Sequence, residues 1–321
     1  MQLKKRRLGT TDMEITAVGL GAWAVGGDWR YGWGATDDSV SVAAIKHAIE
    51  VGVNWIDTAA VYGLGHSEEL VGRALRDIPR SDRPYVFTKC GLVWDLNNRQ
   101  ADPQQNLQPA SIRKEVEDSL RRLGVEVIDL YQFHKPDQTG TPVEESWGEM
   151  VKLVQEGKVR WIGVSNFDVG LLERANEVRH VDSLQPAFSF INREAASHVI
   201  PWAAAHETGV IIFSPMQSGI LTDSFSRERV AKMAAGDWRR GSDDFAEPKL
   251  TQNIARRDAL LPIAQRLGTT ASCVALAWAT AWPGVTAAIV GARESKQVDG
   301  WIGGGSLELG KADLEALNQM L

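Results

Sequence analysis

The chain of 321 residues contains only two cysteines, Cys90 and Cys273, and has no long apolar run. Two cysteines are too few for a disulfide framework, which favours a reducing compartment, so we expect a cytoplasmic protein. No apolar stretch approaches the roughly 18 residues that a membrane-spanning helix needs. The basic residues 1–7 are not followed by the apolar region of a signal peptide. The sequence therefore predicts no membrane partner.

Positive charge is also scarce, because 35 Lys and Arg residues face 41 Asp and Glu residues and leave a net charge of -6. This balance argues against a nucleic-acid partner, which would require a basic face. The six histidines form no H-E-x-x-H motif or similar ligand pair, so we expect no metal. The sequence has neither a phosphate-binding G-x-x-x-x-G-K-[ST] loop nor a G-x-S-x-G nucleophile motif.

The main pattern along the chain is an alternation of short β-branched or aromatic runs with stretches of helical periodicity. Eight strands are predicted, at residues 16–20, 54–56, 85–88, 127–133, 159–164, 183–185, 210–213 and 286–290. Eight strands that alternate with helices are typical of a closed parallel (β/α)8 barrel, here one domain over residues 1–321, and a doubly wound open sheet is the main alternative. Asp37, Ser67 and Ser111 are expected as helix N-caps. Residues 223–252 are predicted to form a long loop after the seventh strand.

Four polar residues follow or end neighbouring predicted strands: Asp57 and Tyr62 after the second, Lys89 after the third and His134 after the fourth. Residues at the carboxyl ends of barrel strands meet at one mouth. Each residue alone has an ordinary structural explanation, such as a loop cap or a buried ion pair, but the four together indicate a site.

These side chains suit the reduction of a carbonyl group, which needs a hydride at carbon and a proton at oxygen. A phenol is a reluctant proton donor at neutral pH, and a nearby ammonium lowers its pKa. We therefore expect Lys89 to lower the pKa of Tyr62 and Asp57 to hold Lys89 in place. His134 is expected to donate a hydrogen bond to the carbonyl oxygen.

The run Asp57–Gly63 (DTAAVYG), followed by Ser67–Gly72 (SEELVG), resembles the signature of the aldo-keto reductase superfamily. Similar segments follow along nearly the whole chain: Leu120–Asp129, Tyr131–His134, Gly163–Phe167, Gln185–Pro186, Asn192–Glu194, Ser214–Pro215 and Ile289–Arg293. The match is greatest to a bacterial branch with Gly-Ala-Arg after the eighth strand. The resemblance implies a reversible NADPH-dependent reduction of an aldehyde or ketone, with Tyr62 as general acid.

The same resemblance implies where the cofactor binds. Ser165, Asn166 and Gln185 would hold the nicotinamide carboxamide, for which their side chains supply suitable donors and acceptors. The pyrophosphate and adenosine would meet a second set of residues: Ser214, Pro215, Gln217, Gly219, Gly291, Arg293 and Gln297. Arg293 favours NADPH, because a guanidinium can bind the 2'-phosphate that NADH lacks. Some relatives have Lys at the position of Gly291 and Arg at that of Gln297, so NADH remains an alternative.

Two other dehydrogenase motifs occur, but in the wrong context. Gly19–Ala24 fits the G-x-G-x-x-A fingerprint, yet a glycine-rich stretch follows it instead of a helix. Tyr131 and Lys135 spell Y-x-x-x-K, which places both residues on one face only in a helix, whereas a strand is predicted here. We interpret Gly19–Ala24 as the strand and loop that bring Trp23 beside the cofactor. Cys90 is expected to point away from Lys89, into packing.

Twelve tryptophans are many for this length, and Trp29, Trp33 and Trp94 lie on loops at the predicted mouth. We expect them to form flat apolar walls for a small carbonyl or alcohol substrate. A regulatory or scaffold subunit that binds NADP(H) without turnover is the first alternative, and a lyase or isomerase on the same fold is the second. The intact Tyr62 and Lys89 argue against the former, and the expected carboxamide site against the latter.

Overall fold

The computed structural model describes residues 2–234 and 236–320, and eight parallel strands in it close into a barrel. Their order around the barrel is β10, β11, β12, β3, β4, β5, β8 and β9, and β9 pairs with β10 to complete the ring. The barrel strands are β3 (Val18–Gly21), β4 (Trp55–Asp57), β5 (Tyr85–Cys90), β8 (Ile128–Phe133), β9 (Val159–Ser165), β10 (Ser183–Gln185), β11 (Gly209–Ile212) and β12 (Ala287–Gly291). The predicted (β/α)8 barrel is confirmed.

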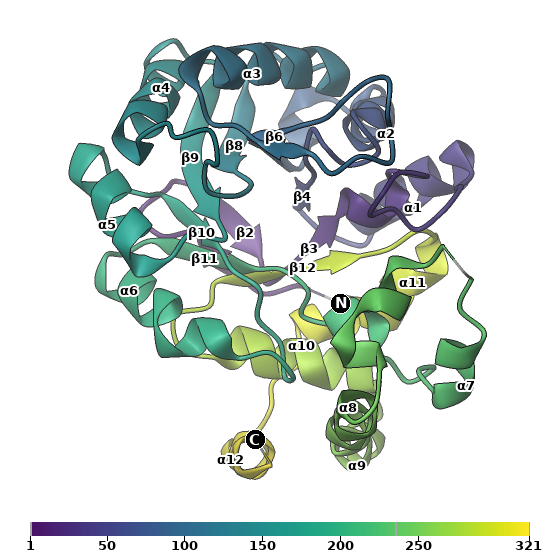
Figure 1. Cartoon of the computed structure of the whole chain (residues 1–321). Coiled ribbons are helices and arrows are strands. Elements are labelled where there is room, and N and C mark those ends of the chain that lie inside the picture. Colours follow the sequence, from purple (N-terminus) through teal and green to yellow (C-terminus); the bar gives the residue numbers. More distant parts are fainter. Residues whose placement is uncertain (1, 235, 321) are drawn as a thin grey trace.

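Helices cover the outside of the barrel (Figure 1). Those that follow the barrel strands are α1 (Asp38–Glu50), α2 (His66–Leu75), α3 (Pro109–Leu123), α4 (Val143–Gln155), α5 (Val169–Val178), α6 (Val199–Ala205), α10 (Ala271–Ala281) and α11 (Ser295–Trp301), and α12 (Lys311–Gln319) ends the described chain. The outer faces of the strands and the inner faces of these helices form the main apolar core. Among the described residues, no helix has the length and apolar character needed to cross a membrane.

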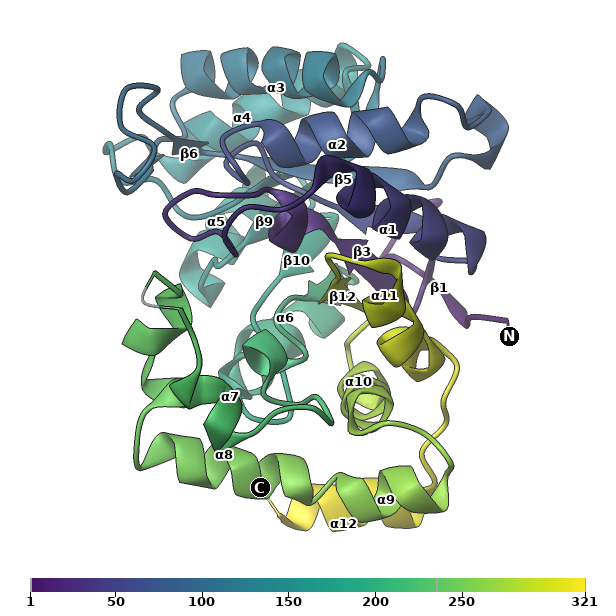
Figure 2. The ribbon, with the colours of Figure 1, turned by 90° about the vertical axis from the view of Figure 1, so that its right-hand side faces the viewer.

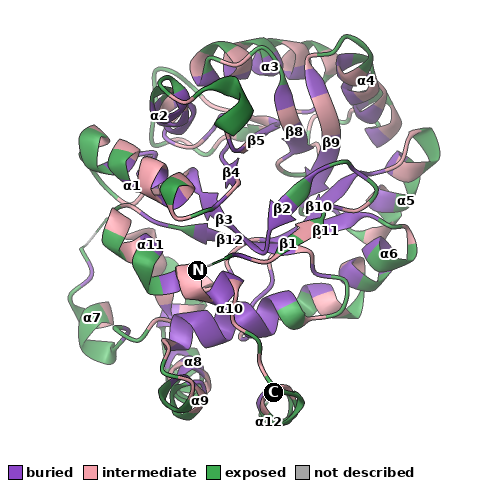
Figure 3. Ribbon diagram, turned by 180° about the vertical axis from the view of Figure 1, so that it is seen from behind, coloured by how far each residue is buried: buried purple, intermediate pink, exposed green. Residues whose placement is uncertain are grey.

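The start of the chain forms a hairpin that the sequence analysis did not predict. Its strands are β1 (Lys5–Arg7) and β2 (Glu14–Thr16), and it lies across the end of the barrel where the parallel strands begin (Figure 3). Leu8, Met13 and Ile15 of the hairpin pack against Trp55 and Phe87 inside the barrel. The hairpin therefore closes this end with an apolar plug, and the first barrel strand begins at Val18 instead of at Thr16.

The segment predicted as a long loop after β11 is instead partly folded. It contains α7 (Arg227–Ala231), two short 3-10 turns, η5 (Trp238–Gly241) and η6 (Asp243–Phe245), and the start of α8 (Lys249–Asp258), after which comes α9 (Leu261–Arg266). Ile220, Phe225, Met233, Phe245 and Leu250 form a small core of their own. The prediction of a loop was wrong. The apolar residues of this segment are spaced too irregularly to predict a single helix, but they still pack together in the folded chain.

Two of the three expected N-caps are also wrong. The Asp37 carboxylate accepts hydrogen bonds from the backbone N–H groups of Ser39 and Val40, as predicted. Ser67 lies inside α2, where its hydroxyl donates to the backbone oxygen of Ala22 and bonds to Thr58. Ser111 lies inside α3 and donates to Glu115. The Ser67 hydroxyl thus ties α2 to the first two barrel loops and does not start a helix.

Candidate active site

The polar side chains of the site come from the inward positions of the barrel strands. Successive residues of a strand point to opposite sides, so every second residue of β4, β5 and β8 points into the barrel. Trp55, Phe87 and Leu130 belong to the apolar interior, and two positions further along these strands stand Asp57, Lys89 and Gln132. An apolar layer therefore lies below a polar layer that faces the open end.

Lys89 is the centre of this polar layer. Its Nζ lies 2.5 Å from Asp57 Oδ1, 2.9 Å from the backbone oxygen of Thr58 and 3.4 Å from the hydroxyl oxygen of Tyr62. The side chains of Lys89 and Asp57 are 0% and 3% exposed. The His134 ring meets the Tyr62 ring edge-on, with 5.4 Å between the centroids. The structure thus brings together the four residues that the sequence predicted at neighbouring strand ends.

The loop that carries Tyr62 is held by a close approach between two backbones. Gly63 has φ +61, and a Cβ at this position would lie 1.9 Å from the backbone oxygen of Gly26. Only glycine fits both requirements. The loop after β3 therefore rests directly on the loop that presents Tyr62.

The electrostatics differ in one respect from the sequence-based expectation. Burial and the charge of Asp57 raise the pKa of Tyr62, and they outweigh the opposite effect of Lys89. Burial opposes the charge on Lys89, but Asp57 and Tyr62 raise its pKa overall. The expected net lowering of the Tyr62 pKa is thus wrong for this structure. Tyr62 keeps its proton at neutral pH, and Lys89 is a cation beside it.

Histidine 134 is neutral in this environment. Burial, aided by the charges of Lys89 and Lys135, lowers the pKa of the His134 ring well below its usual range. The backbone oxygen of His134 accepts a hydrogen bond of 2.9 Å from Asn166 Nδ2. A neutral imidazole at this place carries one N–H donor, which suits a carbonyl oxygen.

The three residues expected at the nicotinamide carboxamide lie at the carboxyl ends of two neighbouring strands: Ser165 ends β9, Asn166 follows it, and Gln185 ends β10. Asn166 Nδ2 donates to Ser165 Oγ at 2.9 Å, and Ser165 Oγ donates to the backbone oxygen of Gln185 at 2.8 Å. The Gln185 amide nitrogen points into the barrel and donates to Asp57 Oδ2 at 3.0 Å and to Gln132 Oε1 at 3.1 Å. Sequence reasoning missed Gln132, which is fully buried, although its spacing from Leu130 places it on the inward side of β8.

Backbone strain marks the loops after β9 and β11. Six described residues other than glycine have positive φ, and four of them are in these loops: Asn166, Ser214, Gln217 and Ser218, at 61, 55, 43 and 52°. The other two are Leu64 and Glu207. Such strain costs of the order of 1–3 kcal/mol per residue and clusters at ligand sites. No heavy atom lies within 4 Å of a Cβ built on Gly219. The strained loops and the open space beside Gly219 fit a bound dinucleotide.

Several other residues expected at the cofactor have partners in the protein. The Gln217 side chain accepts from Ser189 Oγ and donates to Asp244 Oδ2. Gln297 Oε1 accepts a 2.7 Å hydrogen bond from the backbone N–H of Arg293. Gln297 thus fixes the loop after β12. Gly291, the last residue of β12, is exposed just before this loop. Pro215 lies between Ser214 and Gln217 in the strained loop.

An aromatic cluster joins the loop after β3 to the folded segment after β11. Trp23 lies 5.5 Å, between ring centroids, from both Trp33 and Trp238. The guanidinium of Arg239 lies 4.4 Å from the centre of the Trp33 ring, and that of Arg293 lies 5.8 Å from it. Figure 2 shows α7, which belongs to this segment, on the same side of the barrel as β6 (Leu92–Val93). Trp238 and Arg239 were missed because they fall in the segment predicted as a loop.

The tryptophans expected in the substrate pocket separate into two groups. Trp29 and Trp94 belong to one apolar cluster with Tyr62, and the ring centroids of Trp29 and Tyr62 are 6.4 Å apart. Trp33 instead lies among Trp23, Trp238 and the two arginines. Trp29 therefore lies beside Tyr62, Trp94 belongs to the same cluster, and Trp33 lies beside Arg239 and Arg293.

The two alternative dehydrogenase motifs do not form sites. Gly19 and Gly21 lie in β3, which leads into the short 3-10 turn η1 (Ala22–Val25) and not into an α-helix. Tyr131 lies in β8 and packs in the outer core, so it does not share a helical face with Lys135. Cys90 is a buried free thiol in the same outer core, as expected.

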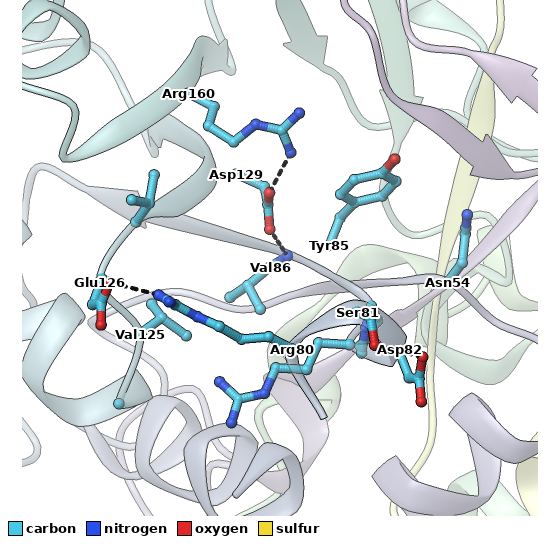
Figure 4. Close-up of a pocket in the computed structure, with 14 residues that line it drawn as sticks. Asn54, Arg80, Ser81, Asp82, Tyr85, Val86, Val125, Glu126, Asp129 and Arg160 are labelled. Atoms are coloured by element: carbon cyan, nitrogen blue, oxygen red, sulfur yellow. Dashed lines mark hydrogen bonds and ion pairs between the residues drawn. The ribbon is translucent and has the colours of Figure 1, made fainter. Parts of the chain in front are cut away.

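A hollow of about 860 Å³ lies at the opposite end of the barrel, where β5 and β8 begin (Figure 4). Four of its charged groups form two ion pairs, Arg160 with Asp129 and Arg80 with Glu126. Asp129 also accepts a hydrogen bond from the backbone N–H of Val86. This hollow is separated from Tyr62 by the apolar layer of the barrel and shares none of the predicted site residues.

The barrel, the four clustered side chains and the strained loops agree with comparisons with known proteins. The model of the Aldo/keto reductase family matches residues 17–321. The chain belongs to the aldo-keto reductase family. It is 33% identical to the aldo-keto reductase YhdN of Bacillus subtilis, over 90% of this chain and 85% of that protein. It is 32% identical to the NADH-specific methylglyoxal reductase of Escherichia coli, over 99% and 98% of the two chains.

A solved structure agrees with this assignment. The glycerol dehydrogenase from Gluconobacter oxydans superposes with a TM-score of 0.90 and 36% identity, over 99% of this chain and 95% of that one. As an aldo-keto reductase, the protein is an oxidoreductase that uses a nicotinamide cofactor and acts on small carbonyl compounds or the corresponding alcohols.

Proposed function

We propose that this aldo-keto reductase reduces an aldehyde or ketone with NADPH and that Tyr62 supplies the proton. The observation that carries the proposal is the 3.4 Å separation of Lys89 Nζ from the Tyr62 hydroxyl, with the same ammonium bound to buried Asp57. A phenol that is protonated at neutral pH and lies next to a fixed cation can release its proton when an alkoxide forms beside it.

A nicotinamide cofactor held by these residues would supply a hydride to the carbonyl carbon. Tyr62 then transfers its hydroxyl proton to the carbonyl oxygen, and Lys89 stabilises the phenolate that remains. His134, which is neutral, donates a hydrogen bond to the same oxygen and orients the substrate. In the reverse direction the phenolate accepts the proton of the alcohol.

We assign the carboxamide to Ser165, Asn166 and Gln185, and the pyrophosphate to the strained loop Ser214–Gly219. The preference for NADPH rests on Arg293, whose guanidinium lies 5.8 Å from the centre of the Trp33 ring. The Escherichia coli relative carries the name of an NADH-specific enzyme. NADH is therefore the second cofactor to be tested. The two buried free thiols favour the reducing cytoplasm as its location.

We propose a small substrate. Trp29 is 6% exposed and packs on Tyr62, so its large ring fills space beside the proposed proton donor. Relatives are named for methylglyoxal and glycerol, which are both three-carbon compounds. Short aldehydes and ketones that carry a neighbouring oxygen are therefore the first substrates to test.

The test follows the oxidation of NADPH and NADH by absorbance with a panel of short aldehydes and ketones, for the native protein and for Tyr62→Phe. We expect turnover with the native protein and a loss of about 10²- to 10⁴-fold in Tyr62→Phe, the usual contribution of a general acid. Cofactor affinity, measured by quenching of tryptophan fluorescence, should stay within about twofold because the ring is retained. Tyr85→Phe, at the other end of the barrel, is the matched control.

Two outcomes would overturn the proposal. Activity retained in Tyr62→Phe would remove this residue from the mechanism. Cofactor binding without turnover of any carbonyl in the panel would favour the regulatory subunit.

A further inference from the structure

Two buried glutamine amides lie against the carboxylate that holds Lys89. Gln132 and Gln185 are 0% and 2% exposed. Gln132 Nε2 donates to Asp57 Oδ2 at 3.3 Å, and Gln185 Nε2 donates to the same oxygen at 3.0 Å. Both oxygens of Asp57 are thus occupied, one by the ammonium of Lys89 and the other by two amides.

The barrel backbone makes room for Gln132. In the parallel ladders Gln132 is in register with Lys89 on β5 and with Gly163 on β9. A Cβ on Gly163 would lie 3.3 Å from Cγ of Gln132 and 2.7 Å from the backbone oxygen of Ser183. The absence of a side chain at Gly163 therefore lets Gln132 reach across β9 toward Gln185.

The hydrogen bonds determine which way both amides face. Gln185 Nε2 donates to Asp57 Oδ2 and to Gln132 Oε1, which uses both of its N–H groups. If the Gln185 amide were flipped, its oxygen would face two other acceptor oxygens, Asp57 Oδ2 and Gln132 Oε1. A flipped Gln132 would lose both of its own hydrogen bonds and oppose its nitrogen to that of Gln185. Each amide thus fixes the orientation of the other.

We propose that Gln132 is a positioning residue that couples the cofactor site to the proton donor. Through Asp57 it holds the Lys89 ammonium beside Tyr62. Through Gln185 it leaves only the Oε1 atom of that amide free to accept from the N–H of the cofactor carboxamide. The inference rests on the proposed function, since it assumes that Tyr62 is the acid and that Gln185 meets the cofactor.

The first variant is Gln132→Met, which keeps the length of the side chain and removes its donor and its acceptor. We expect kcat to fall about tenfold, as for the loss of one buried hydrogen bond that orients a charged group. We also expect the KM for the cofactor to rise severalfold, because the Gln185 amide is no longer fixed. Tyr131→Phe changes the preceding residue of β8, which points into the outer core, and serves as the control with unchanged kcat and KM.

The second variant, Gln132→Glu, gives a readout that a merely structural role would not produce. The titratable groups that face this position from the neighbouring strands are Asp57 and Lys89, with Tyr62 beyond them. The carboxylate of Asp57 raises the pKa of the carboxyl group that Gln132→Glu introduces, so this group stays protonated to a higher pH than a free glutamic acid. While protonated it donates to Asp57 and accepts from Gln185, as the amide does. We expect kcat of Gln132→Glu to be near-native at low pH and to fall about tenfold as pH rises. Its plot of kcat against pH should therefore show a descending limb that the native enzyme lacks.

Two results would overturn the inference: kcat and cofactor KM of Gln132→Met within twofold of the native values, or a Gln132→Glu profile without the additional limb. If Gln132→Met fails to fold, as judged by circular dichroism, the profile of Gln132→Glu decides. Failure of the proposed function is distinguishable, because it would appear as activity retained in Tyr62→Phe whatever Gln132 does.

Discussion

The Nζ atom of Lys89 and the Oδ1 atom of Asp57 are 2.5 Å apart in the closed interior of the barrel. Removal of one member of a buried pair leaves an uncompensated charge, which typically destabilises by about 3–5 kcal/mol, whereas removal of both is far less costly. We therefore expect Lys89→Met to lower the free energy of unfolding in urea by about that amount. The double variant Asp57→Asn, Lys89→Met should recover most of the loss.

Exposed Lys311→Met is the control for the loss of one positive charge. Equal destabilisation in the single and double variants would show that the charge of Asp57 is not the cause.

Arg293→Ala should weaken the binding of NADPH far more than that of NADH. A hydrogen-bonded charge pair contributes about 1.5–3 kcal/mol, so a loss of about 10- to 100-fold is expected for NADPH and less than about twofold for NADH. Titration of tryptophan fluorescence with each cofactor measures both constants. Lys296→Ala, three residues further along in α11, controls for the general loss of charge. Equal losses for the two cofactors would mean that Arg293 does not contact the 2'-phosphate.

Glu115 should make the stability of the protein depend on pH. Burial raises the pKa of this carboxyl from its usual value of 4.5 to about 7, against the opposing hydrogen bonds from Gly91 and Ser111. The folded state thus holds the proton more tightly than the unfolded chain. The resulting stabilisation is full below pH 4.5 and is lost as pH rises through about 7, a change of about 3 kcal/mol.

Urea unfolding between pH 5 and pH 8 measures this change. Glu115→Gln should remove most of the dependence, whereas exposed Glu145→Gln should keep the native slope. A slope that persists in Glu115→Gln would assign the titration to another group.

Trp238→Ala should loosen the segment after β11. The substitution removes ring contacts with Trp23 and Trp33, and aromatic pairs contribute about 0.5–1.5 kcal/mol each beyond their buried area. Limited proteolysis should cleave residues 223–246 about tenfold faster than in the native protein. Trp238→Phe keeps an aromatic ring and should lie close to the native rate. Unchanged cleavage in Trp238→Ala would show that other contacts hold the segment.

The barrel was predictable because its signals are local. Each parallel strand is a short apolar run, and its carboxyl end is marked by the polar residue that follows, as at Asp57 and Lys89. The first strand was displaced because Thr16 pairs with Lys5 in a hairpin, and that hairpin packs on residues far along the chain, Trp55 and Phe87. Ser67 was misread for a similar reason, since its partners Ala22 and Thr58 come from other loops.

The composition of the site was predictable, but its balance of forces was not. Motifs place a phenol, an amine, an acid and an imidazole at one mouth. They do not indicate that burial outweighs Lys89 in the pKa of Tyr62, because this depends on the exclusion of solvent. Gln132 was overlooked because a glutamine within an apolar strand gives no signal until its partner Gln185 is placed beside it.

The N-terminal hairpin has a consequence for the supply of protons. Because the apolar side chains of Leu8, Met13 and Ile15 fill the amino-terminal end of the barrel, its interior is open to solvent only at the carboxyl ends of the strands. In the proposed mechanism, the proton that Tyr62 gives away is replaced from bulk water on the side where product departs. We therefore expect reprotonation of Tyr62 and release of the alcohol to use the same open end of the barrel, beside Trp29.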